Sequence, residues 1–410
     1  MLIKYEFLKI LRRKSTIIVM VVSLIVTVFL FGLPIIQYQT YNQDGVIKGS
    51  DGISFRKKQS EAFSVLLTDE YITQTVQDYQ QLFDDPDNIG FDGTEKFLVG
   101  DAYWNFVAPQ EKLLNIISNN YEAPGTTTGY NNKLPDLDMT NGANFYQARD
   151  AKIEALLNTP AREMSDAQKD YWRNMNSGVK TPFQYGYYEG WEIIISSFEL
   201  VMFALLAVCI VLAPVFSGEY QAGTDAVILS AKYGKTKLIT AKIVASLLFG
   251  LLAFTVHMVV AFGLPLTTFG IDGWDLPLQI ANTIIPYPFT FMQAAFINLG
   301  VIYLVLIAMI ALTLFLSAKM KSPYLVLTVI VPVLFIPMFL SPNGATGAYN
   351  LTLFLLPYNS TSLEIGKYVS YQFGNLVLDV HLVRAILYAA LTLLMLPFAR
   401  LGFKKHQVSA

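Results

Sequence analysis

The chain has 410 residues, of which 53% are hydrophobic and only 15% are charged. This composition excludes a soluble enzyme and indicates an integral membrane protein. The single cysteine, Cys209, lies in an apolar run, so no disulfide framework is possible, and the three histidines are scattered along the chain. The sequence therefore predicts neither a cysteine-based nor a histidine-based metal site.

The N-terminal residues 1–14 combine apolar and basic side chains at helical spacing. This pattern has two compatible interpretations: an amphipathic helix on the lipid of the inner leaflet, or a basic flank that orients the following span. Residues 15–36 supply the roughly 20 apolar residues that one membrane-spanning helix needs. A secretory signal peptide would have a shorter apolar core and a small-residue cleavage site. We therefore expect a cytoplasmic amphipathic helix at 1–14 and an uncleaved first transmembrane helix at 15–36.

Residues 37–190 are polar and rich in tyrosine, and they predict a large extracytoplasmic domain. Apolar side chains recur there with helical periodicity, and clusters of proline and glycine separate the periodic stretches, so we expect a mostly helical domain. Trp104, Trp172 and Trp191 have two interpretations: a ligand platform, or a small core with an interfacial aromatic belt. The core and belt are favoured.

Residues 191–410 form the transmembrane region and are expected to hold five further spanning helices. The predicted spans are 193–215, 243–264, 289–317, 323–340 and 381–399. Under this assignment nearly every short basic stretch falls on the same side of the membrane, and such stretches are retained in the cytoplasm. The sequence thus predicts an all-α integral membrane protein with six transmembrane helices and both termini in the cytoplasm.

One short sequence resembles a catalytic motif. Gly234-Lys235-Thr236 looks like the end of a phosphate-binding loop, but the first glycine of that motif would fall at position 229, where Leu229 stands. The surrounding residues also belong to a loop between spans and not to a nucleotide-binding sheet. No other catalytic or metal-binding spacing is present. We therefore expect a non-catalytic chain that binds no cofactor.

Two ionisable residues in predicted spans are candidates for a transport path, because such groups are costly in a membrane and usually functional. Glu199 lies two turns into the second span, so it either lines the path or sits at the outer headgroups in contact with water. His257 lies in the third span. It either pairs with Glu199, or titrates during transport, or is a buried histidine hydrogen-bonded to a backbone carbonyl.

The segment 216–242 follows the second span and is short, polar and amphipathic. Its candidate functional residues are Glu219, Gly223, Thr224, Lys235, Lys237 and Lys242. The run Glu219-x-x-x-Gly223-Thr224-x-x-x-x-Leu229, followed by these lysines, resembles the cytoplasmic signature of the ABC-2 type transporter permeases. The family often has an arginine and a Pro-Ile-Ser-Arg-like turn where this chain has Lys232-Tyr-Gly-Lys235. The short basic N-terminal helix, the six spans and the outer domain also match the family.

This resemblance implies the permease subunit of an ATP-driven exporter in the plasma membrane. ATP and Mg would be bound by a separate ABC ATPase subunit, which would contact the segment 216–242 as a coupling helix. A second permease subunit, identical or different, and membrane lipid are the other implied partners, and no nucleic acid is expected. The implied cargo is a peptide, a drug or antibiotic, or a cation.

Two other classes remain as alternatives. A secondary transporter needs no ATPase, but it would be expected to show repeated halves and more broken or charged helices near the membrane midplane. A membrane-anchored sensor would use residues 37–190 to bind a ligand. Such a sensor normally carries a sizeable cytoplasmic domain, and the cytoplasmic parts predicted here are small.

Overall fold

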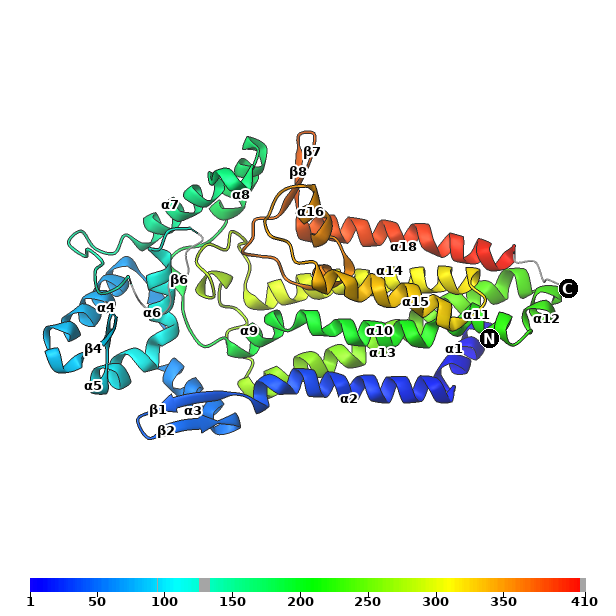
Figure 1. Cartoon of the computed structure of the whole chain (residues 1–410), viewed down its shortest axis with the longest axis horizontal. Coiled ribbons are helices and arrows are strands. Elements are labelled where there is room, and N and C mark those ends of the chain that lie inside the picture. Colours follow the sequence, from blue (N-terminus) through cyan, green and yellow to red (C-terminus); the bar gives the residue numbers. More distant parts are fainter. Residues whose placement is uncertain (94, 125–132, 406–410) are drawn as a thin grey trace.

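The computed structural model describes residues 1–93, 95–124 and 133–405. The molecule is elongated, with a bundle of long helices on one side and a polar domain, residues 37–190, on the other (Figure 1). The N-terminus, α1 and α12 lie at one end of the bundle, which we call the terminal end. The polar domain is attached at the opposite end, which we call the domain end.

The bundle consists of long apolar helices together with shorter helices that precede, follow or continue them. They are α1 (Leu2–Leu11), α2 (Lys14–Ile36), α9 (Glu189–Ser196), α10 (Met202–Leu212), α11 (Pro214–Gln221), α12 (Asp225–Ser230), α13 (Ile239–Phe269), α14 (Phe291–Lys319), α15 (Pro323–Phe335) and α18 (Val380–Lys404). Five stretches of the described chain are long and apolar enough to cross a membrane: Lys14–Ile36, Phe198–Gln221, Gly234–Phe269, Phe291–Lys319 and Val380–Lys404. The sixth predicted span coincides with a shorter apolar helix, Pro323–Phe339. Six spans therefore remain a prediction.

The polar domain is mostly helical, with short antiparallel strand pairs between its helices. Its elements are β1 (Gln39–Asn42), β2 (Gly45–Lys48), α3 (Gly49–Glu61), β3 (Leu66–Leu67), α4 (Asp69–Gln81), β4 (Ile89–Asp92), β5 (Glu95–Leu98), α5 (Gly100–Ala102), α6 (Ala108–Asn120), α7 (Phe145–Leu157), α8 (Asp166–Ser177) and β6 (Phe183–Gln184). Three of the strand pairs, β1 with β2, β4 with β5 and β3 with β6, lie in this domain.

A second polar segment joins α15 to α18. It contains α16 (Ala348–Phe354), α17 (Pro357–Thr361), β7 (Ser370–Phe373) and β8 (Leu376–Asp379), and the two strands form a hairpin. Gly374 has a φ of +62° in its two-residue turn, a conformation that glycine adopts without steric cost. The described chain is mostly helical, as predicted, but these hairpins make the all-α expectation too simple. Their strands are too short to produce a clear alternating pattern.

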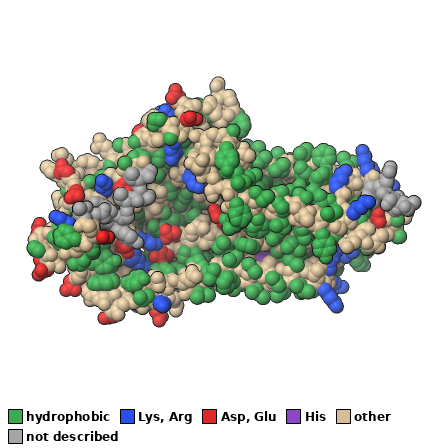
Figure 2. Space-filling view, viewed as in Figure 1, with side chains coloured by type: hydrophobic (Ala, Val, Ile, Leu, Met, Phe, Trp, Pro, Cys, Tyr) green, Lys and Arg blue, Asp and Glu red, His purple; other side chains and the backbone are tan. Residues whose placement is uncertain are grey.

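The surface of the bundle is apolar in its middle and charged at its ends. Figure 2 shows a broad hydrophobic band over the bundle, with lysine and arginine gathered at the terminal end and acidic side chains concentrated on the polar domain. Large apolar side chains such as Ile18 on α2, Val259 on α13 and Leu393 on α18 are more than half exposed. Exposed apolar surface of this extent is explained by contact with lipid. The chain is a multi-pass membrane protein.

The segment Phe198–Gln221 lies at the centre of the bundle. In its most apolar stretch 72% of the residues are buried, whereas only 22% are buried in the corresponding stretches of α2 and α18. The segment is broken between α10 and α11 at Pro214, whose ring removes a backbone donor. Ser317 of α14 compensates for this break: its hydroxyl donates to the carbonyl of Ala213 and accepts from the amides of Phe216 and Ser217. The direction of α11 is thereby fixed by a neighbouring helix.

Candidate coupling site

Glu219 on α11 is the centre of a cluster of charges at the terminal end of the bundle. Its Oε1 accepts from Lys9 Nζ of α1 at 2.7 Å and from Lys242 Nζ of α13 at 2.8 Å. Lys242 Nζ also lies 3.2 Å from Glu6 Oε2 of α1. Two acids and two bases thus join three helices, and we call Glu6, Lys9, Glu219 and Lys242 the four-charge cluster.

The burial of Lys242 makes this cluster energetically important. Its side chain is only 3% exposed, and Glu219 and Glu6 are 11% and 14% exposed. The ammonium group has three donors, and three acceptors surround it: Glu219, Glu6 and the carbonyl of Val215 at 3.3 Å. A buried charge with every donor satisfied is tolerated, whereas removal of one partner typically costs about 3–5 kcal/mol. The cluster therefore holds α1, α11 and α13 in one relative position.

The turn after α11 is built around Thr224 and two glycines. Thr224 Oγ1 donates to the second carboxylate oxygen of Glu219 at 2.6 Å, so this carboxylate bonds to side chains through both oxygens. Gly223 has a φ of +63°, which a residue with a side chain adopts only with strain. A Cβ at Gly234 would lie 1.6 Å from the carbonyl oxygen of Ile228, so only glycine permits this close approach of the backbone. The two glycines shape the tip.

The tip formed by α12 and the following turn, residues 225–238, carries exposed basic and apolar side chains; we call it the basic tip. Lys235 and Lys237 are exposed and are not part of the four-charge cluster. Lys237 lies 4.8 Å from the ring centre of Tyr233 and Lys232 lies 5.5 Å from it, within cation–π range. Val227 is 72% exposed. The predicted coupling residues therefore separate into a buried pair, Glu219 and Lys242, and an exposed set, Gly223, Thr224, Lys235 and Lys237. Thr224 is exposed but still contacts the buried pair through Glu219.

Glu6 and Lys9 were not among the functional residues predicted from the sequence. Their backbone atoms belong to α1, more than 200 positions before Glu219, and nothing local indicates the pairing. The one available signal is that Glu6 is the single acidic residue in the otherwise basic stretch 1–14. An isolated acid three residues before a lysine on the same helical face indicates an i, i+3 pair, but not its distant partner.

The structure gives Glu199 and His257 different partners. Glu199 accepts from the hydroxyls of Tyr358 and Ser362, in the segment between α15 and α18. His257 is 2% exposed and hydrogen-bonds through both ring nitrogens to hydroxyls of α2, Ser23 at 3.2 Å and Thr27 at 2.8 Å. The suggested pairing of the two residues is therefore not present. Polar contacts like those of His257 commonly hold membrane helices together.

The described residues offer no obvious place for a metal ion. Within residues 1–93, 95–124 and 133–405, no group of three or more histidine, cysteine, aspartate or glutamate side chains could hold one. Cys209 is fully buried in α10. Gly234-Lys235-Thr236 lies in a helical turn leading into α13 and not at the end of a strand, so the phosphate-loop geometry is absent there.

Comparison with known proteins identifies the class of the chain. The structure shows a bundle of apolar helices with a buried cluster of charges behind an exposed basic tip. The family model described as "ABC-2 family transporter protein" matches residues 1–396, so the chain belongs to this family. Searches among curated proteins and among solved structures gave no match. Family membership makes the chain a membrane subunit of a transporter, a typically non-catalytic component that associates with an ABC ATPase.

Proposed function

We propose that this chain is the permease subunit of an ATP-driven exporter and that the four-charge cluster couples it to a separate ATPase. The basic tip contacts the ATPase, where ATP and Mg are bound, and the cluster transmits the resulting movement to α1 and α13. The cargo is a peptide, a drug or antibiotic, or a cation, and the complex contains a second permease subunit. Driving a two-state permease almost completely from one state to the other requires ~5 kcal/mol of differential binding.

The observation that carries this proposal is the position of the cluster directly behind the exposed tip. Glu219 lies two residues before the end of the central buried segment, and Lys242 lies in the first turn of the next long helix, α13. A displacement of the tip therefore acts on two membrane helices and on α1 through short charged contacts. A plain connecting loop would not need a buried lysine with three acceptors.

Orientation follows from the charge distribution. Basic side chains gather at the terminal end, which supports a cytoplasmic position for both termini and an extracytoplasmic position for the polar domain in the plasma membrane (Figure 2). A sixth crossing is supported by a contact in the polar segment before α18: Ser165 Oγ of the polar domain donates to Gln372 Oε1 at 2.6 Å. The chain leaves α14 at the terminal end and must cross the bundle to reach Gln372.

The test is affinity purification of the full chain from its native cells in mild detergent. We expect an ABC ATPase to co-purify, and the double variant Lys235→Glu/Lys237→Glu to lose it because the tip then repels an acidic surface. The matched control is Lys48→Glu/Lys58→Glu, which makes the same change at two exposed positions of the polar domain. Absence of an ATPase, or equal retention by the two variants, would overturn the proposal and leave a secondary transporter as the better account.

A further inference from the structure

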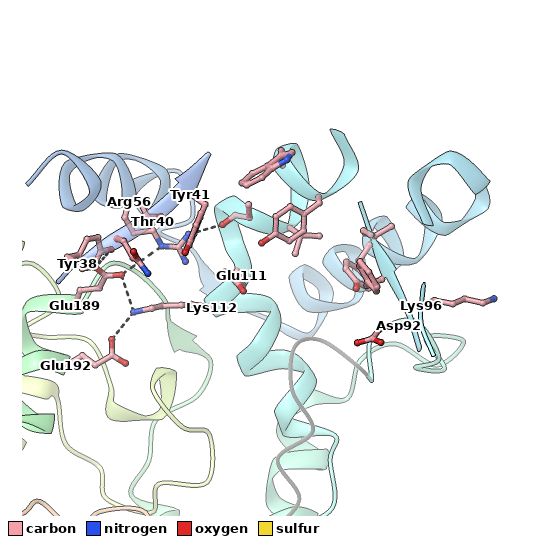
Figure 3. Close-up of a pocket in the computed structure, with 18 of the residues that line it drawn as sticks. Tyr38, Thr40, Tyr41, Arg56, Asp92, Lys96, Glu111, Lys112, Glu189 and Glu192 are labelled. Carbon is pink, nitrogen blue, oxygen red and sulfur yellow. Dashed lines mark hydrogen bonds and ion pairs between the residues drawn. The ribbon is translucent and has the colours of Figure 1, made fainter. Parts of the chain in front are cut away.

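A large cavity lies where the polar domain meets the domain end of the bundle (Figure 3). Its volume is about 1280 Å³, which is enough for a drug-sized molecule. Pro34 of α2 and Ile193 of α9 line it on the bundle side, so it opens beside the ends of two bundle helices. Residues of the strands β1, β4 and β5, of the helices α3, α4 and α6, and of the turn before α6 also line it. The four-charge cluster lies at the other end of the bundle.

One wall of the cavity is charged but internally neutralised. Glu189, only 9% exposed, lies 3.2 Å from Lys112 Nζ and 4.0 Å from Arg56 and accepts from the hydroxyl of Tyr38. Lys112 also pairs with Glu192 at 2.8 Å (Figure 3). Burial opposes the charge of Lys112, but Glu192 and Glu189 outweigh it and raise the pKa of the ammonium group. These bases are already occupied by carboxylates and offer little attraction to an anion.

Glu111 is the carboxylate that this wall leaves unpaired. It comes from α6 one residue before Lys112, is half-buried, and has no hydrogen-bond or ion-pair partner among the described residues. Figure 3 places it between the charged wall and the β4–β5 hairpin. Lys96 of this hairpin also lines the cavity, but its ammonium group points away from Glu111. A half-buried carboxylate without a partner is a ready site for a cation.

The opposite wall is aromatic. Its rings come from the β4–β5 hairpin, α4 and the turn before α6: Tyr79, Phe91, Phe97, Tyr103 and Trp104. Phe91 is 64% exposed and Phe97 is 45% exposed, although phenylalanine is usually buried. Trp172 and Trp191 are buried in the core, as expected, but Trp104 faces the cavity, so the core-and-belt interpretation does not cover it. Aromatic faces attract organic cations and bind their apolar parts.

We infer that this cavity binds an amphipathic organic cation, with its charge beside Glu111 and its apolar body against the aromatic wall. Among the described residues the lining holds two carboxylates without a partner, Glu111 and the exposed Asp92, and one unpaired base, Lys96, on the hairpin. Glu111 is the half-buried one, and a half-buried carboxylate facing several rings favours a bulky cation over an anion of the same size. The site goes beyond the proposed function, because binding here requires neither an ATPase nor transport.

The test measures equilibrium binding of tetraphenylphosphonium to the purified full chain in lipid nanodiscs without any ATPase. Tetraphenylborate, an anion of nearly the same shape, is the control ligand, and empty nanodiscs correct for partition into lipid. We expect the cation to bind saturably and the anion not to. Glu111→Gln should weaken cation binding about tenfold, which corresponds to the loss of one favourable charge contact. Glu61→Gln, the same change at an exposed position outside the cavity, should leave binding unchanged.

A second variant keeps the inference testable if Glu111→Gln fails to fold. Trp104→Leu removes a ring from the opposite wall and should weaken the cation about fivefold. Equal binding of the two ions, or equal affinities in Glu111→Gln and Glu61→Gln, would overturn the inference. Because no ATPase is present, either result is independent of the co-purification that tests the proposed function.

Discussion

At the scale of single residues, Lys242 is the side chain on which the coupling site depends most. Its buried ammonium group satisfies two carboxylates at once, and Glu219 and Glu6 would lose their shared partner without it. The local structure of α11 would remain, but two buried acids would have to share the more exposed Lys9. Charge balance in this cluster is therefore as important as the individual contacts.

We predict that Lys242→Met destabilises the chain by about 3–5 kcal/mol, because it leaves buried carboxylates uncompensated. The double variant Lys242→Met/Glu219→Gln should recover part of this loss by removing one of the stranded charges. Thermal unfolding in detergent measures the effect, and Lys237→Met is the exposed control, expected within about 0.5 kcal/mol of the wild type. A double variant no more stable than Lys242→Met would argue against charge stranding as the cause.

At the scale of elements, the break between α10 and α11 is held by α14. Proline at position 214 leaves backbone groups without their usual helical partners. The Ser317 hydroxyl hydrogen-bonds to three backbone groups around this break, two amides and one carbonyl. Tyr220 adds a hydrogen bond to the carbonyl of Ala318 at 2.9 Å. The segment that carries Glu219 is thus aimed by its neighbour and not by its own sequence alone.

We predict that Ser317→Ala lowers the free energy of unfolding by about 1–3 kcal/mol, because two buried amides lose an acceptor. It should also weaken ATPase co-purification, since α11 no longer has a fixed direction. Ser196→Ala is the matched control, because Ser196 is exposed and donates only to the carbonyl of Ile193 within its own helix. If Ser317→Ala left stability and ATPase recovery unchanged, the break would not need α14.

The long helices could be predicted from the sequence because hydropathy is a local property. The 243–264 prediction lies within the helical segment Gly234–Phe269, whereas the 193–215 and 289–317 predictions overlap the segments Phe198–Gln221 and Phe291–Lys319 but begin before them. The four-charge cluster could not be predicted whole: its Glu219–Lys242 pair bridges a turn, and Glu6 and Lys9 come from a distant helix. The β7–β8 hairpin has a turn-forming pair in its sequence, Gly374-Asn375, but its four-residue strands are too short to show an alternating pattern. Packing across the bundle decides such contacts.

At the scale of the whole molecule, the polar domain and the basic tip must lie on opposite sides of the membrane if the tip contacts an ATPase in the cytoplasm. The β7–β8 hairpin must then share the side of the polar domain, since Gln372 contacts Ser165. The one natural cysteine, Cys209, is fully buried, so introduced cysteines can be labelled against a low background. The topology is therefore directly measurable.

We predict that Asp166→Cys and Asn375→Cys react with a membrane-impermeant maleimide in intact cells, whereas Lys235→Cys reacts only after permeabilisation. These three positions are exposed in the structure, so a difference in labelling reports the side of the membrane and not burial. If Asn375→Cys were protected while Asp166→Cys was labelled, the apolar helix Pro323–Phe339 would not cross the membrane. The chain would then cross five times instead of six. Labelling of Lys235→Cys in intact cells would reverse the proposed orientation.

The most direct measurement of the central claim is photo-crosslinking from the basic tip in living cells. The photoreactive residue p-benzoylphenylalanine would be placed at Val227, which is 72% exposed, and at Val46 of the polar domain, which is 50% exposed. We expect irradiation to join the chain to an ABC ATPase from position 227 and not from position 46. If position 227 forms no adduct with an ATPase while the chain is stably inserted, the basic tip is not the coupling surface.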